Sequence, residues 1–253
     1  DVLTADAVPM LYQTEPESLI PDAAADAEEK NSVVYRSSCD TDSCFHFIDK
    51  LSGYNNEKNN RIGGIKVMRK NFGAKSWLYP EPVLIVAAYG EDGVADAMNA
   101  AWGGISGNAE ISMCLSPGHK TVKNILKKGA FTVSIADAAH VTECDYVGIV
   151  SANDVPDKLE RAGLHTQKSE FVDAPIIEEL PMALDCKLIS YDEDTHRMVG
   201  EIVNINADES IIGENGQIDP SKFEPIIYDA PNSAYLKIGE KAGNAFKDGE
   251  KLK

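Results

Sequence analysis

Basic residues are scarce in this sequence relative to acidic ones, and the shortage narrows the classes of partner that the chain can bind. The 253 residues include 24 Lys and Arg against 41 Asp and Glu, which gives a formal net charge of −17. A surface of that sign repels phosphate backbones and anionic lipid head groups. We therefore expect no nucleic-acid partner and no attachment to a membrane surface.

Long hydrophobic runs are also missing. The longest uninterrupted one extends over residues 83–88, whereas a helix that crosses a bilayer needs roughly 20 apolar residues. We therefore expect no membrane span. The first residues show no basic segment followed by an apolar one, as a secretory leader would. A leader that had been removed would leave no trace, so this observation leaves the localisation open; we expect a cytoplasmic protein, with export, for example to a periplasm, as the alternative.

Cysteine is sparse and scattered, which excludes a disulfide scaffold. Cys39 and Cys44 alone lie close together along the chain, and they would form a small loop disulfide in an exported protein. Cys114 and Cys186 fall in strand patterns, where cysteine serves as a small apolar residue. Cys144 precedes Asp145, whose charge raises a thiol pKa, so we expect a poor nucleophile.

The common signatures of catalytic and nucleotide sites are absent from the sequence. It contains no GxGxxG after a strand, no P-loop, no GxSxG, no HExxH and no CxxC. The histidines have no metal-ligand spacing, and we interpret each as a surface or loop residue: His46, His119, His140, His165 and His196. We expect no metal site and assign no catalytic side chain.

The sequence divides into two regions that differ in composition and in apolar periodicity. Residues 1–67 are acidic and polar with little apolar periodicity, so we predict a partly irregular N-terminal extension. Residues 68–253 have a regular pattern and are predicted to form the folded domain.

Most of the regular elements in that domain have the pattern of strands. Strands are predicted over residues 82–89, 95–102, 110–115, 131–136, 183–191, 198–205, 226–228 and 234–238, with the two long ones forming a hairpin. Helices are predicted over 121–128 and, with an interruption, over 139–162. Because no strand–helix–strand unit repeats, we predict a mainly β protein with helical insertions, in the form of an antiparallel barrel.

Residues 116–121, Ser-Pro-Gly-His-Lys-Thr, lead from an expected strand into an expected helix. Free backbone N–H groups where a helix begins, together with hydroxyls and a lysine, suit an anion such as a phosphate. The alternative is that Ser116 or Thr121 caps the helix while Pro117 and Gly118 make the turn. Taken alone, these residues favour the cap.

Residues 97–103, Ala-Met-Asn-Ala-Ala-Trp-Gly, form a second candidate segment. Their small side chains would let a flat ring approach the backbone, Asn99 offers both a donor and an acceptor, and Trp102 offers an aromatic surface. The alternative is a buried strand whose alanines pack against a helix. The residues alone leave both interpretations open.

Taken in order, these segments resemble the flavin reductase-like family of FMN-binding split barrels, and most closely its flavoredoxin-like members. The resemblance covers about residues 68–253. It runs through Pro82-Val-Leu-Ile-Val, Asn99-Ala-Ala-Trp, residues 116–125, Gly129-Ala-Phe-Thr-Val-Ser-Ile, Asp145-Tyr-Val-Gly-Ile-Val-Ser, Val199-Gly-Glu-Ile-Val and Tyr235-Leu-Lys-Ile-Gly-Glu.

The resemblance implies a homodimer of FMN-binding split β-barrels with one FMN held non-covalently in each subunit. The flavin ring and ribityl chain would lie along Asn99, Ala100, Ala101 and Trp102. The phosphate would be received by Ser116, Lys120 and Thr121, which favours the anion interpretation of that turn and is compatible with a cap. Tyr146 and Ser151 would approach the flavin more loosely. Ser134 stands where many relatives have Asn.

By the same resemblance, the chain would be an FMN-dependent oxidoreductase whose chemistry belongs to the flavin. It would pass electrons from a nicotinamide donor, NADH or NADPH, or from a protein donor to free flavin, ferric iron or a redox protein. Two alternatives stay open, namely an FMN electron carrier without turnover and a binding module that lacks the flavin. The resemblance does not extend to residues 1–67.

Overall fold

The computed structural model describes residues 61–62, 65–66 and 68–253. The expectations for residues 1–60 and for the Cys39–Cys44 pair lie outside the described residues. Of the described residues, those from Ser76 onward belong to one compact unit and those up to Lys75 to another. In the latter, β1 (Arg61–Ile62) pairs antiparallel with β2 (Ile65–Lys66).

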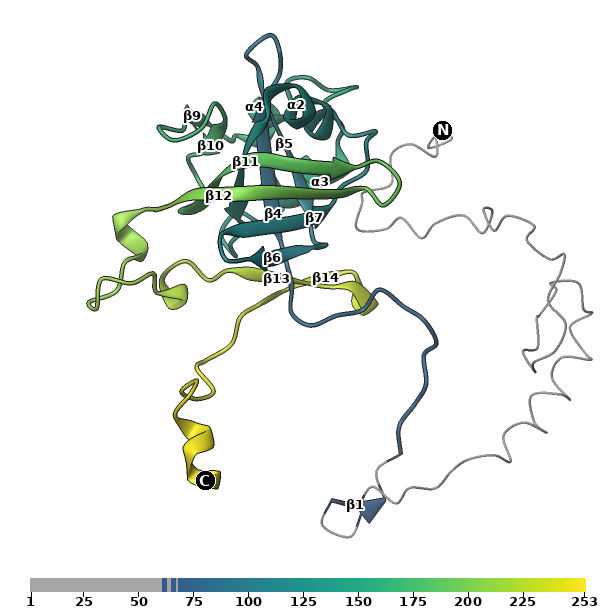
Figure 1. The fold of residues 1–253 in the computed structure, drawn as a ribbon, viewed down its shortest axis with the longest axis vertical. Helices are drawn as coiled ribbons and strands as arrows, with labels where there is room; N and C mark the ends of the chain where they lie inside the picture. The colour runs from purple at the N-terminus through teal and green to yellow at the C-terminus, as the bar shows by residue number, and fades with distance from the viewer. Residues whose placement is uncertain (1–60, 63–64, 67) are drawn as a thin grey trace, which may run out of the picture. The chain divides into compact units, whose positions relative to one another are not determined.

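A seven-stranded antiparallel sheet dominates the unit that begins at Ser76 (Figure 1). Its strands lie in the order β5-β4-β8-β11-β12-β7-β6. Their bounds are β4 (Leu84–Tyr89), β5 (Ala95–Ala100), β6 (Gly103–Gly107), β7 (Glu110–Cys114), β8 (Ala130–Ile135), β11 (Met182–Asp192) and β12 (Arg197–Ala207). The predicted hairpin of two long strands is confirmed as β11 and β12, which pair along their whole length.

Strand β4 is apolar on both faces because both faces are buried. Leu84 and Val86 enter one core, which β7, β11, β12 and helix α2 (Lys120–Lys128) complete. Ile85 and Ala87 point to the opposite face and enter a second core. A strand covered on both sides has a continuous apolar run instead of alternation, and the run at residues 83–88 has this origin.

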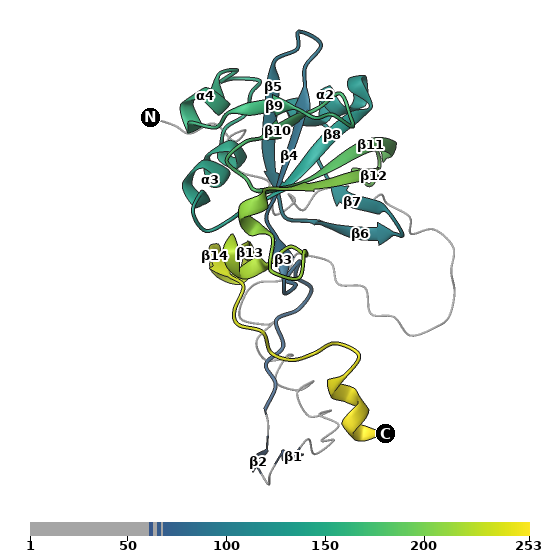
Figure 2. The same ribbon diagram turned by 90° about the vertical axis from the view of Figure 1, so that its left-hand side faces the viewer.

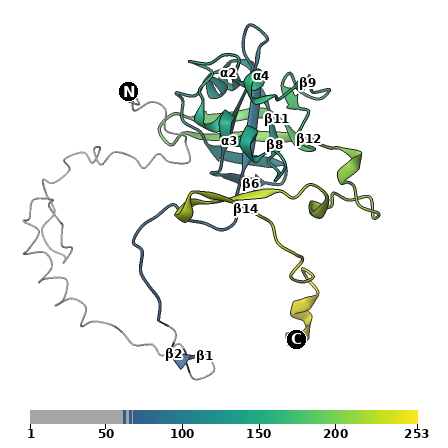
Figure 3. The ribbon, with the colours of Figure 1, turned by 180° about the vertical axis from the view of Figure 1, so that it is seen from behind.

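Helices cover the sheet on two sides. Helix α2 sends Val122 and Ile125 into the first core and ends at Gly129, whose φ of 69° is left-handed and whose N–H donates to Ile125 O. Helices α3 (Val141–Ile149) and α4 (Lys158–Ala162) pack on the second core. They lie behind the β11–β12 hairpin in Figure 1 and in front of it in Figure 3.

The remaining strands form two small sheets. A three-stranded sheet has the order β14-β13-β3, with β3 (Glu81–Pro82), β13 (Ile226–Asp229) and β14 (Ala234–Lys237). The other pairs β9 (Thr166–Lys168) with β10 (Pro175–Ile177), above the centre of the main sheet in Figure 2. Short 3-10 turns cover Glu209–Ile211, Pro220–Lys222, Ala230–Asn232 and Asp248–Leu252.

Three details of the sequence-based strand assignment were wrong. The run predicted over 82–89 is divided between β3 and β4, and the strand predicted over 95–102 ends at Ala100. Strands β6, β9 and β10 were missed. Strand β6 has the sequence GGISG, in which three glycines hide the strand pattern.

The buried cysteines behave as predicted, although the reason differs for one of them. Cys186 lies in the first core and Cys144 in the second. Burial is the main cause that raises the pKa of each thiol to about 12, and the charge of Asp145 adds only a small part at Cys144. Both thiols are therefore poor nucleophiles.

Two negative findings concern the described residues alone. No helix among them has the length and apolar content that a bilayer crossing requires. No group of three or more His, Cys, Asp and Glu among them has an arrangement that holds a metal ion.

We expect Gly200→Ala to destabilise the protein, because the core leaves no room for a Cβ at this position. An added Cβ would lie 2.4 Å from Phe131 Cζ, and Phe131 is fully buried in the first core. Overpacking of this kind costs about 1–3 kcal/mol. Urea denaturation measures the loss, with Gly104→Ala as the matched control because its Cβ would meet nothing within 4 Å. Equal stability of the two variants would contradict the account of this core.

Candidate functional site

A cleft of about 350 Å³ joins several segments that the sequence analysis singled out. Its walls are the first turn of α2, the end of α3, the loop at residues 150–154 and the middle of β5. Of the predicted cofactor-binding residues, five line this cleft: Asn99, Ser116, Lys120, Thr121 and Ser151. The fold therefore brings together the strand segment and the turn segment, which lie more than fifteen positions apart in the sequence.

The first turn of α2 has no side-chain cap. His119 occupies the N-cap position and forms no side-chain hydrogen bond to the turn, so the interpretation of Ser116 or Thr121 as a simple cap is wrong. The bend is instead closed by the backbone, since His119 N–H donates to Ser116 O at 3.3 Å. Lys120 and Thr121, the first two residues of α2, line the cleft, so the uncapped amides and the positive end of the helix dipole lie at its wall.

A buried ion pair anchors this turn to the sheet. Asp96 in β5 accepts a hydrogen bond from the Thr121 hydroxyl at 2.6 Å with Oδ2, and its Oδ1 lies 3.1 Å from Lys158 Nζ. All three side chains are buried. Because the hydroxyl proton of Thr121 is engaged by Asp96, Thr121 offers an anion its backbone N–H, while its side chain holds the turn in place.

Lys158 is 3% exposed, and its ammonium lies beside the Asp96 carboxylate and two backbone carbonyls. Besides Asp96, it donates to Val147 O at 3.3 Å and Val150 O at 3.0 Å, at the C-terminal end of α3. A cation there complements the negative end of the helix dipole. Burial lowers the pKa of Lys158, and the charge of Asp96 opposes that shift.

Asn99 has one amide atom in use and one free. Its Nδ2 donates to Cys144 O at 3.0 Å, whereas its Oδ1 has no partner among the described residues, although the residue is only 2% exposed. Gly148 on α3 permits this arrangement, since a Cβ there would lie 2.9 Å from Asn99 Cβ. An unsatisfied buried acceptor on a cleft wall favours a ligand that donates an N–H or O–H group.

The loop at residues 150–154 is tied to the turn before α2. Asn153 Nδ2 donates to Gly118 O at 3.1 Å and to Ser151 Oγ at 3.0 Å. Two walls of the cleft are therefore connected directly, which fixes its width at this end.

His119 also lines the cleft and lies in a loop, as its sequence position predicted. Burial is the main cause that lowers its pKa, and the positive charge of Lys158 adds to the effect. The imidazole is therefore neutral at neutral pH and able to accept or donate a hydrogen bond.

The other predicted residues do not line this cleft. Ala100 lies in the first core and Ala101 in the second. Trp102 is partly exposed, and its carbonyl accepts the Cys114 N–H at 2.9 Å. Tyr146 packs against the second core, and Ser134 is fully buried outside the cleft.

Sequence reasoning missed Asp96, Lys158, His119, Asn153 and Gly148 as parts of this site. Two of them carried a usable signal. Asp96 is the single charged residue of β5, and a charge inside a buried strand needs a partner. Lys158 begins a short helix, where its charge opposes the helix dipole and so indicates a role outside that helix.

Comparison with known proteins shows which family has this architecture. The family model described as a flavin reductase like domain matches residues 76–230. Flavoredoxin of Desulfovibrio vulgaris (Miyazaki F) is 37% identical, with a TM-score of 0.69 over 72% of this chain and 100% of that one. Flavoredoxin of Methanosarcina acetivorans is 26% identical, with a TM-score of 0.67 over 74% and 100%.

A third structure, an FMN-binding domain of a flavin reductase-like enzyme from Shewanella baltica, shares the fold. It is 23% identical, with a TM-score of 0.59 over 65% of this chain and 89% of that one. The mainly β fold with its helical insertions is thus a split β-barrel. The chain belongs to the flavin reductase-like family, so the predicted fold class and the resemblance are confirmed.

We expect Lys158→Ala to destabilise the protein strongly, because it leaves the buried Asp96 carboxylate without its cation. Breaking a buried pair from one side costs about 3–5 kcal/mol. Chemical denaturation measures the change. The control is Arg161→Ala, which breaks the exposed pair between Arg161 and Asp157 on the same short helix and should change stability little. A similar loss of stability in both variants would show that the buried ion pair contributes no more than the exposed one.

Proposed function

We propose that this chain is an FMN-dependent oxidoreductase of the flavin reductase or flavoredoxin type. The observation that carries the proposal is the cleft itself, which is lined by the uncapped start of α2 with Lys120 and by Asn99, whose Oδ1 has no partner among the described residues. The helix start suits an anion and the free amide oxygen suits a hydrogen-bond donor, and a flavin mononucleotide carries both groups. The membership of the flavin reductase-like family supports the same cofactor.

The residues at the start of α2 would hold the phosphate. Free backbone amides, the helix dipole and the Lys120 ammonium attract an anion together. This local positive charge stands out in a chain whose net charge is −17. Ser116 and Ser151 border the same space with their hydroxyls. Thr121 contributes its N–H, since its hydroxyl is held by Asp96.

Strand β5 and the residues after it would hold the flavin ring. The Oδ1 of Asn99 is an acceptor without a partner, and the imide N–H of an isoalloxazine ring is a matching donor. We propose Ala100, Ala101 and Trp102 as the backbone along which the ring and ribityl chain extend. Tyr146 fits least well in the predicted set, because it packs against the second core.

Bound FMN would supply the redox chemistry, taking electrons from NADH, NADPH or a protein donor and passing them to free flavin, ferric iron or a redox protein. The chain's own residues bind, orient and shield. Asp96 and Lys158 hold the turn at the start of α2 against β5, so little order would have to be created when a phosphate binds there. We further propose that two copies of the chain form the homodimer that the family resemblance implies.

We expect the purified protein to show the visible absorption bands of FMN, or to acquire them when FMN is added. Lys120→Ala should weaken FMN binding by about 1–3 kcal/mol, the usual loss for a hydrogen bond to a charged group. Fluorescence titration measures the affinity. Lys127→Ala is the control, because Lys127 lies on the same helix and pairs with Glu91 at 2.5 Å. A colourless protein that does not bind FMN would overturn the proposal.

We also expect NADH or NADPH to reduce the FMN-loaded protein faster than it reduces free FMN. Anaerobic stopped-flow absorbance at the flavin band follows the reduction, with free FMN at the same concentration as the reference. Equal rates with and without the protein would instead favour an electron carrier that receives its electrons from another protein.

A further inference from the structure

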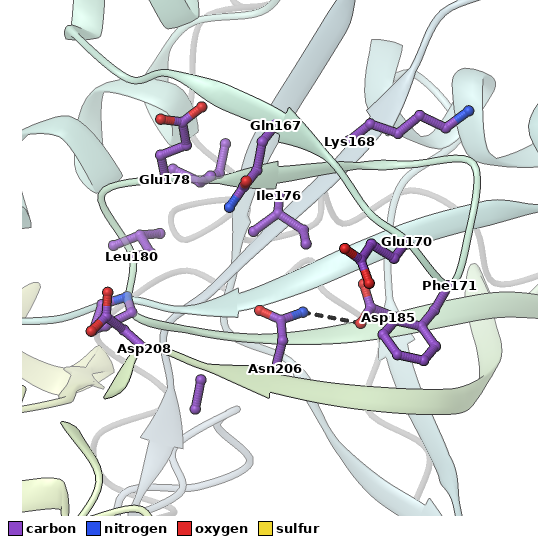
Figure 4. Close-up of a pocket in the computed structure, with 13 residues that line it drawn as sticks. Gln167, Lys168, Glu170, Phe171, Ile176, Glu178, Leu180, Asp185, Asn206 and Asp208 are labelled. Atoms are coloured by element: carbon purple, nitrogen blue, oxygen red, sulfur yellow. Dashed lines mark hydrogen bonds between the residues drawn. The ribbon is translucent and has the colours of Figure 1, made fainter. Parts of the chain in front are cut away.

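A second cleft, of about 320 Å³, shares no residue with the proposed flavin site. It lies between the segment that contains β9 and β10 and the facing ends of β11 and β12 (Figure 4). Its charge is one-sided. Four carboxylates line it, from Glu170, Glu178, Asp185 and Asp208, against the single ammonium of Lys168.

Asp185 forms the buried part of this cleft, and only one of its oxygens is satisfied. It is 0% exposed and lies in β11 opposite Asn204 of β12. Its Oδ2 accepts from Asn204 Nδ2 at 2.8 Å and from Asn206 Nδ2 at 3.0 Å. Its Oδ1 is buried and has no hydrogen-bond partner within the described part of the chain.

The lysine that lines this cleft pairs with a different carboxylate. Lys168 Nζ pairs with Asp173 Oδ1 at 2.9 Å, and its side chain extends away from Asp185 in Figure 4. No ion pair joins Asp185 to any residue from 68 to 253. Removing a carboxylate from water without a compensating cation is costly, and neutral amide donors compensate only in part.

The rest of the cleft indicates which cation fits. Leu180 and Ile176 provide apolar walls, and Phe171 adds an aromatic ring that is 55% exposed. An aromatic face beside carboxylates attracts organic cations. Since no cluster in the described ranges has an arrangement that holds a metal ion, a ligand that carries its own apolar body suits this cleft better than a bare ion.

We propose that this cleft binds a small primary alkylammonium compound. An N–H of its ammonium group donates to Asp185 Oδ1, and the other carboxylates strengthen the local negative potential. The carbon chain lies against Phe171 and Leu180. A primary ammonium is favoured over a quaternary one because Oδ1 requires a hydrogen-bond donor and not only a positive charge. This proposal stands independently of the flavin site.

Nitrogen-15 NMR of the full chain tests the proposal through the side-chain amides of Asn204 and Asn206. We expect titration with n-butylammonium chloride to shift both signals in a saturable way. Tetramethylammonium has the same charge without N–H donors, and n-butanol has a similar chain without the charge, so both should bind more weakly. Sodium chloride at equal ionic strength corrects for screening.

Two variants and one control connect the binding to this cleft. Asp185→Asn keeps the shape and should weaken n-butylammonium binding at least about tenfold, since it replaces a charged acceptor. Glu170→Gln changes an exposed lining carboxylate and should weaken binding less. Glu201→Gln, an exposed carboxylate of β12 outside the cleft, should leave the affinity unchanged.

Three results would overturn the proposal. The first is equal shifts with n-butanol or with sodium chloride, because the response would then not depend on the ammonium group. The second is unchanged affinity in Asp185→Asn with the backbone spectrum otherwise intact. The third result applies if Asp185→Asn does not fold. It is an equal affinity for n-butylammonium in Glu170→Gln and Glu201→Gln.

Discussion

The contact between Asp96 and Lys158 is the constraint on which the candidate flavin site depends. One carboxylate in β5 holds the first turn of α2 through Thr121 and the start of α4 through Lys158. Lys158 in turn closes the end of α3 through Val147 and Val150. Helices α2, α3 and α4, which all border the cleft, are thus attached to one residue of the sheet, Asp96. Buried charges of this kind are stable only when every partner is in place.

The sheet makes this arrangement possible because its central strands are buried on both faces. Residues of β4 alternate between two cores, so the strand cannot slip by one residue without exchanging both sets. Strand β5 pairs with β4 in a fixed register, Asp96 opposite Ala88 and Asn99 opposite Ile85. Asp96 and Asn99 therefore hold fixed positions on β5, where they contact α2 and α3.

Two buried carboxylates, those of Asp96 and Asp185, differ in the partners that offset the cost of their burial. Asp96 accepts the Thr121 hydroxyl with Oδ2, and its Oδ1, which has no hydrogen-bond partner among the described residues, lies 3.1 Å from the Lys158 ammonium. Asp185 has two amides on one oxygen and none on the other, in a cleft lined mainly by further acids. Burial makes an incomplete shell costly, so Asp96 with its cation serves the structure, whereas Asp185 without one is the carboxylate at which we propose a ligand.

Local pattern in the sequence determined the mainly β architecture, the long hairpin, helix α2 with its stop at Gly129, and the two segments around Asn99 and Lys120. Apolar periodicity and turn residues act over a few positions, so they are readable without a structure. Only the tertiary structure decided that these segments share a cleft, that Thr121 turns its hydroxyl to Asp96, and that Tyr146 faces a core. The glycine-rich β6 was likewise assigned by its pairing with β7. Such features arise from partners distant along the chain, and their residue types alone fit several environments equally well.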